Sequence, residues 1–508
     1  MSKPAANSEP LPDDPQQLKA MVQDLRGQLA WYQEQHRLAQ AKRFAHAQDV
    51  APEQADLGLF DEAEQELHRE ERSPVRAHQR KRRQRGGGRE ELPEHLPREE
   101  LVHEAEAHEQ ACACGGACHV IGEEVSEQLE HIPGQLKVLV HRRKRYGCRS
   151  CEEGVAEAPR PAQPIPGSRA APGLLATIIV AKYLDAMPLY RQARFYARQG
   201  VAMLDRSVLS HWTVRAGELL EPLVDRLHAC LLGAGVVHAD ETPLQVLKEP
   251  GRKARQKSTM WVYGTGGREP PIVIYCYQPT RGSEHPIEFL DGYAGYLQRD
   301  GFSGYRRLER LCPQIQGVGC MAHVRRKFVD VLKGQPSGGG DSFAEEVVER
   351  IGALYGIERE IAELDDAERY RQRQEQAVPR LEALRERLDE KLVQVPPKSL
   401  LGKAIGYALN EWPYLMRYVE DGRLAIDNSY VERAIKPFVI GRKNFLFSNT
   451  PRGARASANH YTVIETARAN GLDPHAYLEH LFRHLPGIDP DHPQGLDDLL
   501  PWNVALES

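Results

Sequence analysis

Residues 235–323 alternate between short apolar segments and helical segments, and this alternation constrains the fold more than any other feature of the chain. The apolar segments are rich in β-branched and aromatic residues and are bounded by Gly or Pro, a pattern typical of strands. Predicted strands cover 235–247, 259–264, 271–277, 296–300 and 315–323, and predicted helices cover 284–293 and 305–311. The first three strands follow one another directly, which predicts an antiparallel meander. The order β-β-β-α-β-α-β favours a mixed ribonuclease-H-like sheet with helices on its faces.

Two aspartates interrupt this pattern. Asp240 lies in an otherwise apolar strand, and Asp300 ends another strand before a glycine. A buried carboxylate is unfavourable unless it is paired or bound to metal, and two neighbouring carboxylates repel unless a cation neutralises them. Their strands are neighbours in the proposed sheet, so we expect the two side chains to meet. The alternative is that Asp240 bonds to backbone on an edge strand and that Asp300 belongs to an ordinary turn.

A third carboxylate, Glu432, opens a predicted helix after the favourable capping residues 427–429. Pro437 is expected to end or kink this helix. A carboxylate beside a basic tract indicates a metal ligand next to a polyanion. Taken alone, the stretch favours a capped surface helix with a solvated ion pair, and only partners elsewhere in the chain can overturn that interpretation.

Together, Asp240, Asp300 and Glu432 predict a catalytic centre. Oxygen ligands and a phosphate substrate call for Mg²⁺ or Mn²⁺, and two such ions can activate a water or a 3′-hydroxyl and stabilise the leaving oxygen. Glu241 and Asp427 are rival ligands. Candidates for positioning phosphates are His323, Arg325, Arg326, Lys436, Arg442 and Lys443.

Length and charge limit the function classes. With 508 residues, three or four domains are expected. The net charge of -5 provides no bulk attraction to nucleic acid, so DNA contacts have to come from local basic clusters. No apolar run reaches the roughly 18 residues of a membrane span, and the N-terminus lacks the apolar core of a signal peptide. We therefore expect a cytoplasmic, nucleoid-associated protein.

Five of the nine cysteines lie between residues 112 and 151, and in a reducing compartment such clustering favours metal over disulfides. Cys148 and Cys151 have the C-x-x-C spacing of a zinc ribbon. The first knuckle offers Cys112, Cys114 and Cys118 for two places. Cys114 is the expected ligand, and the other place stays open, with Cys112 as its candidate and His119 and His141 as spare ones. Structural Zn²⁺ is therefore predicted.

Basic clusters surround this module. A Gly-flanked run that includes Arg82 and Arg83 predicts a flexible arm that neutralises phosphates, or else a merely solvated linker. Arg143 and Lys144 stand just before the second knuckle and are further candidates for DNA contact.

Helical segments lie at both sides of the predicted sheet. Near the N-terminus, apolar residues follow a 4-3-4-3 spacing from Leu18 to Tyr32, which predicts a leucine-zipper-like helix that forms a dimer or packs on its own chain. Helices at 173–184, 188–198 and 205–220, the last carrying Arg206, make a helix-turn-helix candidate, although three-helix packing without DNA contact is equally common. A stretch dense in Glu and Arg, 342–392, predicts a helical insertion before Glu432.

These motifs resemble the large transposase of insertion-sequence-66-type bacterial mobile elements, which has a DDE catalytic centre. The resemblance covers nearly the whole chain, although Ala111 stands where that family has a cysteine. It is carried by residues 114–126, 148–151, 183–192, 238–242, 300–305, 319–328, 428–447, 453–456, 465–474 and 499–502. It implies a triad of Asp240, Asp300 and Glu432, a helical insertion before the glutamate, and partnership with small accessory proteins of the element.

The sequence thus predicts a multidomain α/β DNA transposase that binds the ends of its own element, cleaves DNA and transfers the 3′ end to a target. Bringing two ends together requires a homo-oligomer. The alternatives are a ribonuclease-H-like nuclease without strand transfer and a non-catalytic zinc-containing DNA-binding regulator. The expected domains are a zipper helix at 16–48, a basic linker at 74–98, a zinc module at 99–157, a helical DNA-binding domain at 172–230, a catalytic domain at 231–450 with its insertion at about 335–420, and a C-terminal domain at 451–508.

Overall fold

The computed structural model describes residues 162–506 except 267–268, 335–341 and 489–493, together with 136–142, 145–147, 155–157 and scattered positions between 19 and 36. It divides into two units, one of them Arg72–Arg160. In that unit two short strands, β1 (Arg145–Gly147) and β2 (Val155–Glu157), pair antiparallel. The predicted zinc cysteines and the basic residues Arg82, Arg83, Arg143 and Lys144 lie outside the described residues.

The larger unit is built on a five-stranded mixed sheet with the order β5-β4-β3-β6-β7. The first three strands form the predicted antiparallel meander, and β6 and β7 run parallel to β3. All of β4 after its first residue is buried, as expected of a strand covered on both faces. The bounds are β3 Val236–Gln245, β4 Lys257–Thr265, β5 Val273–Gln278, β6 Gly295–Gln298 and β7 Ile315–Val318.

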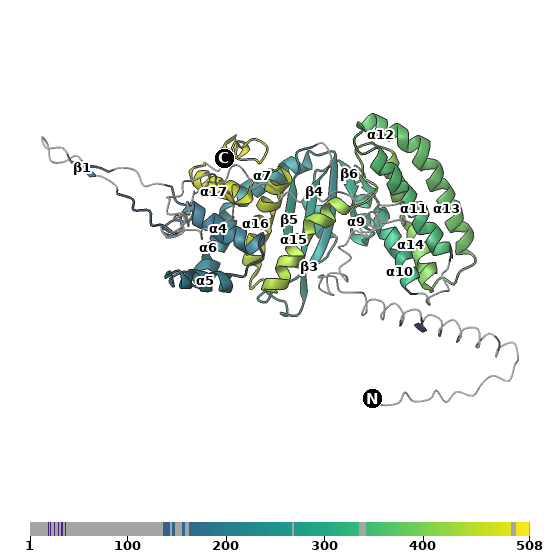
Figure 1. Cartoon of the computed structure of the whole chain (residues 1–508), viewed down its shortest axis with the longest axis horizontal. Coiled ribbons are helices and arrows are strands. Elements are labelled where there is room, and N and C mark those ends of the chain that lie inside the picture. Colours follow the sequence, from purple (N-terminus) through teal and green to yellow (C-terminus); the bar gives the residue numbers. More distant parts are fainter. Residues whose placement is uncertain are drawn as a thin grey trace, which may run out of the picture. The chain divides into compact units, whose positions relative to one another are not determined.

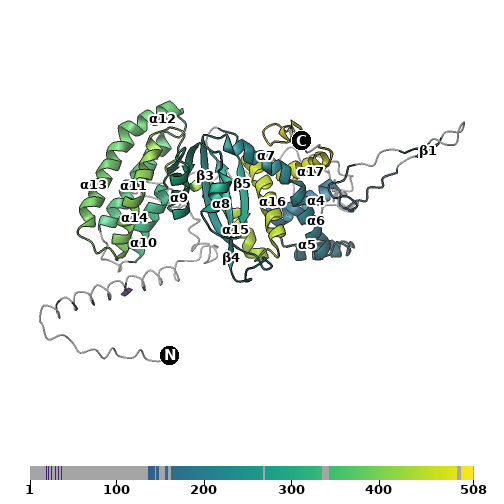
Figure 2. The same ribbon diagram turned by 180° about the vertical axis from the view of Figure 1, so that it is seen from behind.

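Helices cover both faces of this sheet. Helix α15 (Ser429–Phe445) packs on β3 and β4 and crosses the face seen in Figure 1. Helices α8 (Glu284–Phe289) and α9 (Ser303–Leu311) belong to the opposite face, where α8 crosses the sheet in Figure 2. There, the ring of Phe289 stacks 3.8 Å from that of Tyr263 on β4. The prediction that Pro437 ends or kinks α15 was wrong in placing an end there, since the helix continues through it to Phe445.

Helices from both ends of the described region share a core with the sheet. The N-terminal helices are α4 (Pro172–Tyr183), α5 (Leu189–Arg198), α6 (Arg206–Leu219) and α7 (Glu221–Leu232), and the C-terminal ones are α16 (Pro451–Ala469), α17 (Pro474–His484) and the short α18 (Gln494–Asp497). Leu175 of α4 and Leu481 of α17 are fully buried in this common core. Helix α16 also covers the edge strand, because Thr462 and Thr466 bond to the backbone of Tyr275 and Val273.

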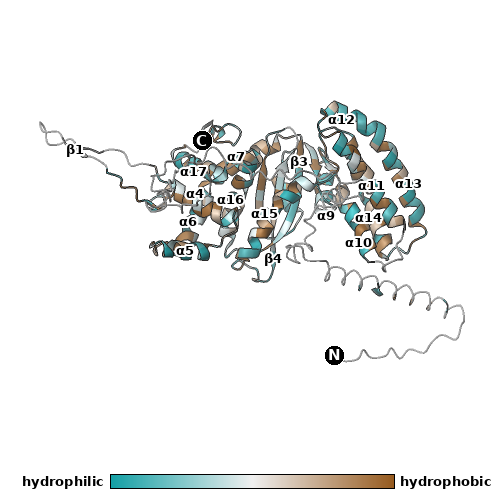
Figure 3. Cartoon of the chain, in the orientation of Figure 1, coloured by the Kyte–Doolittle hydropathy of each residue, from teal (hydrophilic) through white to brown (hydrophobic). Residues whose placement is uncertain are grey.

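A second core lies within the helical insertion. Its helices carry hydrophobic residues on their inner faces and hydrophilic residues elsewhere (Figure 3). The bounds are α10 Met321–Lys333, α11 Ser342–Glu360, α12 Asp366–Gln372, a π-helical turn Arg373–Ala377, α13 Val378–Leu392, α14 Leu400–Leu415 and a 3₁₀ turn Met416–Val419. Among the described residues, no helix combines the length and the apolar character that crossing a bilayer would require.

Candidate active site

Asp240 and Asp300 lie at adjacent positions of the sheet. Strand β3 pairs in parallel with β6, with His238 opposite Gln298. Two residues further along both chains, the same register brings Asp240 opposite Asp300, on the same face because side chains alternate with a period of two. Both are half-buried. The main-chain N–H of Phe302 donates to Asp300 Oδ1 at 2.9 Å, which fixes that carboxylate at the turn after β6.

Glu432 reaches this site from the first turn of α15, as the sequence predicted. The residue before the helix, Asn428, is fully buried and bridges to β3. Its Oδ1 lies 3.1 Å from His238 Nδ1, and its amide donates to the Ala239 carbonyl at 2.9 Å. These contacts fix the start of α15 against the strand that carries Asp240.

The three carboxylates act on one another electrostatically. Burial raises the pKa of Asp240 well above its ordinary value, and the charges of Glu241, Glu432 and Asp300 raise it further. The backbone N–H of Glu241, which donates to Asp240 Oδ1 at 2.8 Å, works in the opposite direction. A carboxyl group whose pKa is raised by burial and by neighbouring acids is a candidate for a functional site.

Both rival carboxylates have other partners. Glu241 accepts hydrogen bonds from Arg281 Nε at 2.8 Å and from the Tyr305 hydroxyl at 2.9 Å, on the opposite face of β3. Asp427 accepts from the Tyr355 hydroxyl of the insertion at 2.7 Å and from the Ser429 backbone at 3.0 Å.

Helix α10 and the residue before it supply three side chains around Glu432. His323 Nδ1 lies 3.5 Å from Glu432 Oε1, and an Arg326 guanidinium nitrogen lies 3.6 Å from Oε2. Cys320 precedes the helix, and its thiol, the His323 ring and the Glu432 carboxylate offer ligand atoms within 4.8 Å of one another. This close group includes neither aspartate. Cys320 is a buried free cysteine. That it stands three residues before His323 was the one signal in the sequence that could have pointed to this group.

The insertion also reaches Asp300 through a buried arginine that our sequence reasoning did not single out. Arg299 is fully buried, and its guanidinium donates to the Asp300 carbonyl at 3.0 Å and to Glu411 of α14 at 2.7 Å. Glu309 is its second acidic partner, at 2.9 Å. Arg299 therefore links the backbone of Asp300 to Glu411 of the insertion through charged hydrogen bonds.

The basic candidates are distributed unevenly. Arg325 is only 4% exposed on α10, like its buried neighbours Val324 and Phe328, whereas Lys327 is exposed. Arg442 is half-buried and donates to Thr242 on β3 at 3.3 Å. Lys436 and Lys443 are also half-buried. Arg206 is exposed at the start of α6, which Asp205 caps by accepting from the backbone N–H of Val208 at 2.8 Å.

The donor set fits divalent cations such as Mg²⁺ or Mn²⁺. Asp240, Asp300 and Glu432 offer hard oxygen atoms, and the charges of neighbouring carboxylates add to burial in raising the pKa of Asp240. A bound cation would relieve that repulsion.

Comparison with known proteins gives consistent matches along the chain. The family model described as "Transposase IS66 family" matches residues 167–456, and the IS66 C-terminal element matches 462–502. A zinc-finger binding domain of transposase IS66 matches 109–152, and a model described as "Transposase C of IS166 homeodomain", a leucine-zipper domain, matches 31–101. No solved structure matches the chain.

Full-length relatives agree with these matches. The uncharacterized protein y4jD of Sinorhizobium fredii is 35% identical over 97% of both chains. The uncharacterized protein y4qI of the same organism is 36% identical over 82% of this chain and 77% of its own length. With a family model over more than half of its length and a relative that spans nearly all of it, the chain belongs to the IS66 family of DDE transposases.

Proposed function

We propose that this transposase binds the ends of its own element, cleaves one DNA strand at each end and transfers the 3′ end to target DNA, with Asp240, Asp300 and Glu432 as its catalytic residues. Family membership implies a DNA-binding catalytic transposase, and the proposal adds the mechanism. The strand order and the parallel β3–β6 pair support a ribonuclease-H-like catalytic domain.

The observation that carries the proposal is the pair of contacts by which buried Asn428 fixes the start of α15, and with it Glu432, against the strand that carries Asp240. The pKa of Asp240, raised first by burial and then by the charges of Glu241, Glu432 and Asp300, agrees with this placement. The three side chains come from β3, from the turn after β6 and from α15, and each is fixed by local hydrogen bonds or helix packing. When bound there, two Mg²⁺ or Mn²⁺ ions supply charge that activates the attacking oxygen and stabilises the leaving one. The carboxylates hold and orient this charge, and Arg442, Lys436 and Lys443 of α15 position the phosphates of the DNA backbone.

Contacts outside the catalytic domain would give selectivity for the ends. Arg206 on the exposed face of α6 is suited to contact DNA. In the other unit, Arg82, Arg83, Arg143 and Lys144 add phosphate contacts beside a zinc module held by Cys114, Cys148, Cys151 and Cys112. Joining two ends requires a homo-oligomer, and small accessory proteins of the element are further partners.

The test is to incubate the purified full chain with labelled element-end duplex, a target plasmid and Mn²⁺. Nicked ends together with joined products are the expected result. Nicks without joined products would favour a nuclease without strand transfer, and end binding without any cleavage would favour a regulator.

A further inference from the structure

Cys320, His323 and Glu432 have the composition of a site for a transition metal rather than for Mg²⁺. A thiol, an imidazole and a carboxylate are ligands that Zn²⁺ accepts together, whereas Mg²⁺ prefers oxygen alone. Cys320 directly precedes α10, and His323 lies in its first turn. The two side chains are therefore placed by a single rigid element, and Glu432 approaches from α15.

The distances suit one shared ion. The three ligand atoms lie within 4.8 Å of one another, and His323 Nδ1 is 3.5 Å from Glu432 Oε1. Ligand atoms of a tetrahedral zinc ion lie roughly 3.4 to 3.8 Å apart, given bonds of about 2.0 to 2.3 Å. Small side-chain shifts would therefore bring all three into coordination, with a fourth position open to water.

Burial and the charges of Glu432 and Asp427 raise the pKa of the Cys320 thiol, so a metal ion has to displace the thiol proton when it binds. The backbone N–H of Asn428, which donates to the sulfur at 3.2 Å, and the N-terminus of α10 work in the opposite direction. The positive charge of Arg326 repels a bound cation. Its guanidinium lies beside Oε2 of Glu432, however, whereas Oε1, the oxygen proposed to bind zinc, faces His323.

We propose that Cys320, His323 and Glu432 bind Zn²⁺, and that Zn²⁺ bound there withdraws Glu432 from the catalytic aspartates and inhibits the transposase. Binding depends only on the three ligands, whereas the inhibition rests on the proposed function. A rise in free zinc would then act as an off-switch for DNA cleavage.

Cobalt tests the binding, because a thiolate bound to Co²⁺ gives a charge-transfer absorption. The background is the full chain with Cys112, Cys114, Cys118, Cys148 and Cys151 replaced by Ser, so that the zinc module contributes no thiolate. We expect one equivalent of Co²⁺ to give the absorption and Zn²⁺ to displace it. Adding Cys320→Ser should abolish the absorption. Adding Cys312→Ser should leave it unchanged, because Cys312 is a half-buried cysteine that precedes β7, whereas Cys320 follows that strand. Absence of the signal in the background, or its persistence after Cys320→Ser, would overturn the site.

Inhibition is tested separately. In the Mn²⁺ cleavage assay, the rate with micromolar Zn²⁺ is divided by the zinc-free rate of the same variant. This assay uses the chain with its zinc-module cysteines intact, because that module is proposed to contribute to DNA binding. We expect a fall of at least tenfold in the wild-type chain and a much smaller one after Cys320→Ser. Equal inhibition in both would overturn the regulatory role. If the wild-type chain cleaves no DNA without zinc, the proposed function and the inhibition fail together, while the cobalt result still decides whether the site binds metal.

A different observation concerns the β3–β4 hairpin. Its loop and the first residue of β4 carry four exposed basic residues, Lys248, Lys253, Arg255 and Lys257. The one acidic residue of the loop, Glu249, is only 8% exposed and pairs with Arg252. This end of the hairpin therefore presents four positive charges to solvent, and the one carboxylate of its loop, Glu249, is already paired with Arg252.

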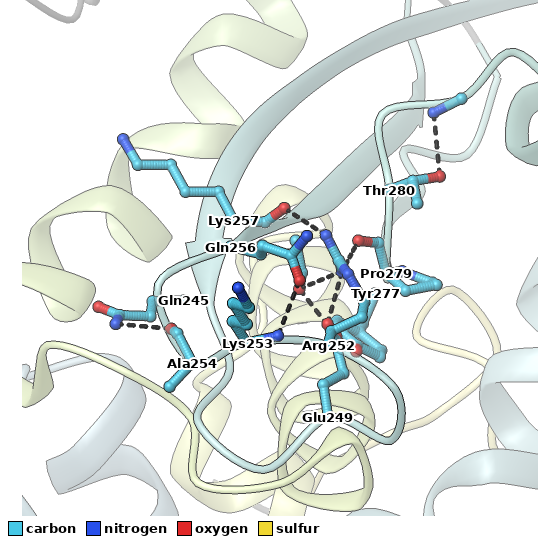
Figure 4. Close-up of polar contacts among 12 residues, drawn as sticks. Gln245, Glu249, Arg252, Lys253, Ala254, Gln256, Lys257, Tyr277, Pro279 and Thr280 are labelled. Atoms are coloured by element: carbon cyan, nitrogen blue, oxygen red, sulfur yellow. Dashed lines mark hydrogen bonds and ion pairs between the residues drawn. The ribbon is translucent and has the colours of Figure 1, made fainter.

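The hairpin is rigid enough to present these charges. Glu249 accepts from the hydroxyls of Ser258 and Tyr277, while Arg252 donates to the carbonyls of Lys257 and Pro279 (Figure 4). The base of the hairpin is also bonded to the segment after α15. There, the backbone N–H of Lys248 donates to the Asn449 carbonyl at 2.9 Å. The end of β3 lies five residues from Asp240, roughly 17 Å along the strand or about five base pairs of duplex.

The geometry points to this hairpin as a clamp for the duplex DNA that flanks the cleaved phosphate. The test measures binding of the full chain to element-end duplex over a range of salt concentrations. Replacing Lys253 and Arg255 by Ala should weaken binding and lower the slope of log K against log salt by about two. The matched control replaces Arg359 and Lys398, exposed residues of the insertion, and should leave both unchanged. Unchanged affinity and slope in the hairpin variant would refute the clamp, whether or not the chain cleaves DNA.

Discussion

Asn428 Oδ1 lies 3.1 Å from Nδ1 of His238, so the start of the helix that carries Glu432 is bonded to the strand that carries Asp240. The same amide donates to the Ala239 carbonyl, and both Asn428 and His238 are buried. A single side chain thus sets the spacing between two of the proposed catalytic acids, which are 192 positions apart in the sequence.

Replacing Asn428 by Ala is expected to destabilise the chain by about 2 to 4 kcal/mol, because a buried imidazole N–H and a buried carbonyl would lose their partner. DNA cleavage should fall as well, since α15 would no longer be fixed to β3. Urea unfolding and the Mn²⁺ cleavage assay measure the two effects. The matched control is Asn444→Ala, at an exposed position, and should change stability by less than about 1 kcal/mol. Equal stability of both variants would show that the Asn428 contacts contribute little.

Replacing Asp240 by Asn is expected to abolish cleavage, by more than about a hundredfold, while end binding persists. The same change should raise thermal stability at neutral pH. The pKa of Asp240 is higher in the folded chain than in the unfolded one, so its ionised form opposes folding above its unfolded pKa, and the neutral amide removes this opposition. The melting temperatures of the metal-free wild type and of Asp240→Asn are compared at pH 8 and at pH 4.5. We expect the substitution to raise the melting temperature more at pH 8. A gain that is no larger at pH 8 would contradict the electrostatic coupling.

Stability should fall as the pH drops from about 6.5 toward 4. Burial lowers the pKa of His238 to about 4, from 6.5 in its absence. The folded chain therefore keeps the imidazole of His238 neutral, while the unfolded chain binds a proton below pH 6.5. Above pH 6.5 this costs no stability, and between pH 6.5 and 4 the free energy of unfolding falls by roughly 1.4 kcal/mol per pH unit. His323 and His460, with pKa values lowered to about 3, act in the same direction. His238→Asn should make the stability profile shallower between pH 6.5 and 4, whereas exposed His211→Asn should not. Parallel profiles for the wild type and His238→Asn would be inconsistent with a neutral buried ring.

Replacing Glu411 by Gln tests whether the insertion supports the catalytic domain. The change keeps the shape but leaves the buried guanidinium of Arg299 with one acidic partner fewer. We expect a loss of about 3 to 5 kcal/mol in unfolding free energy and slower cleavage, because Arg299 also holds the Asp300 carbonyl. Glu386→Gln on the exposed face of α13 is the matched control. If cleavage falls no more than stability explains, Arg299 has no positioning role.

Sequence reasoning found the meander and the helical insertion because each leaves a local periodicity. Asp240 was noticed because a charged residue interrupts an apolar strand. Cys320 was passed over because a single thiol in an apolar context looks the same whether it packs or binds metal. The roles of Asp240, Asp300 and Glu432 as a triad remain predictions that the cleavage assay has to test.

Two features could not be read from local pattern. The helix through Pro437 persists because burial of Phe438 and Val439, about 1.5 to 3 kcal/mol each, outweighs a proline penalty of about 3 kcal/mol. The pairing of α4 with α17 joins segments about 300 residues apart. Helix α4 is apolar on nearly all sides, so its sequence shows that it is buried but does not show against what.

The threonines of α16 and the side chains of α17 complete a core that begins with α4. During synthesis, a growing polypeptide that has not yet emerged as far as residue 484 would leave β5 as an open edge and the first helices without their packing partner. The ribosome must therefore finish almost the entire chain before this enzyme can assemble, and a prematurely terminated product would be prone to aggregate rather than to cut DNA.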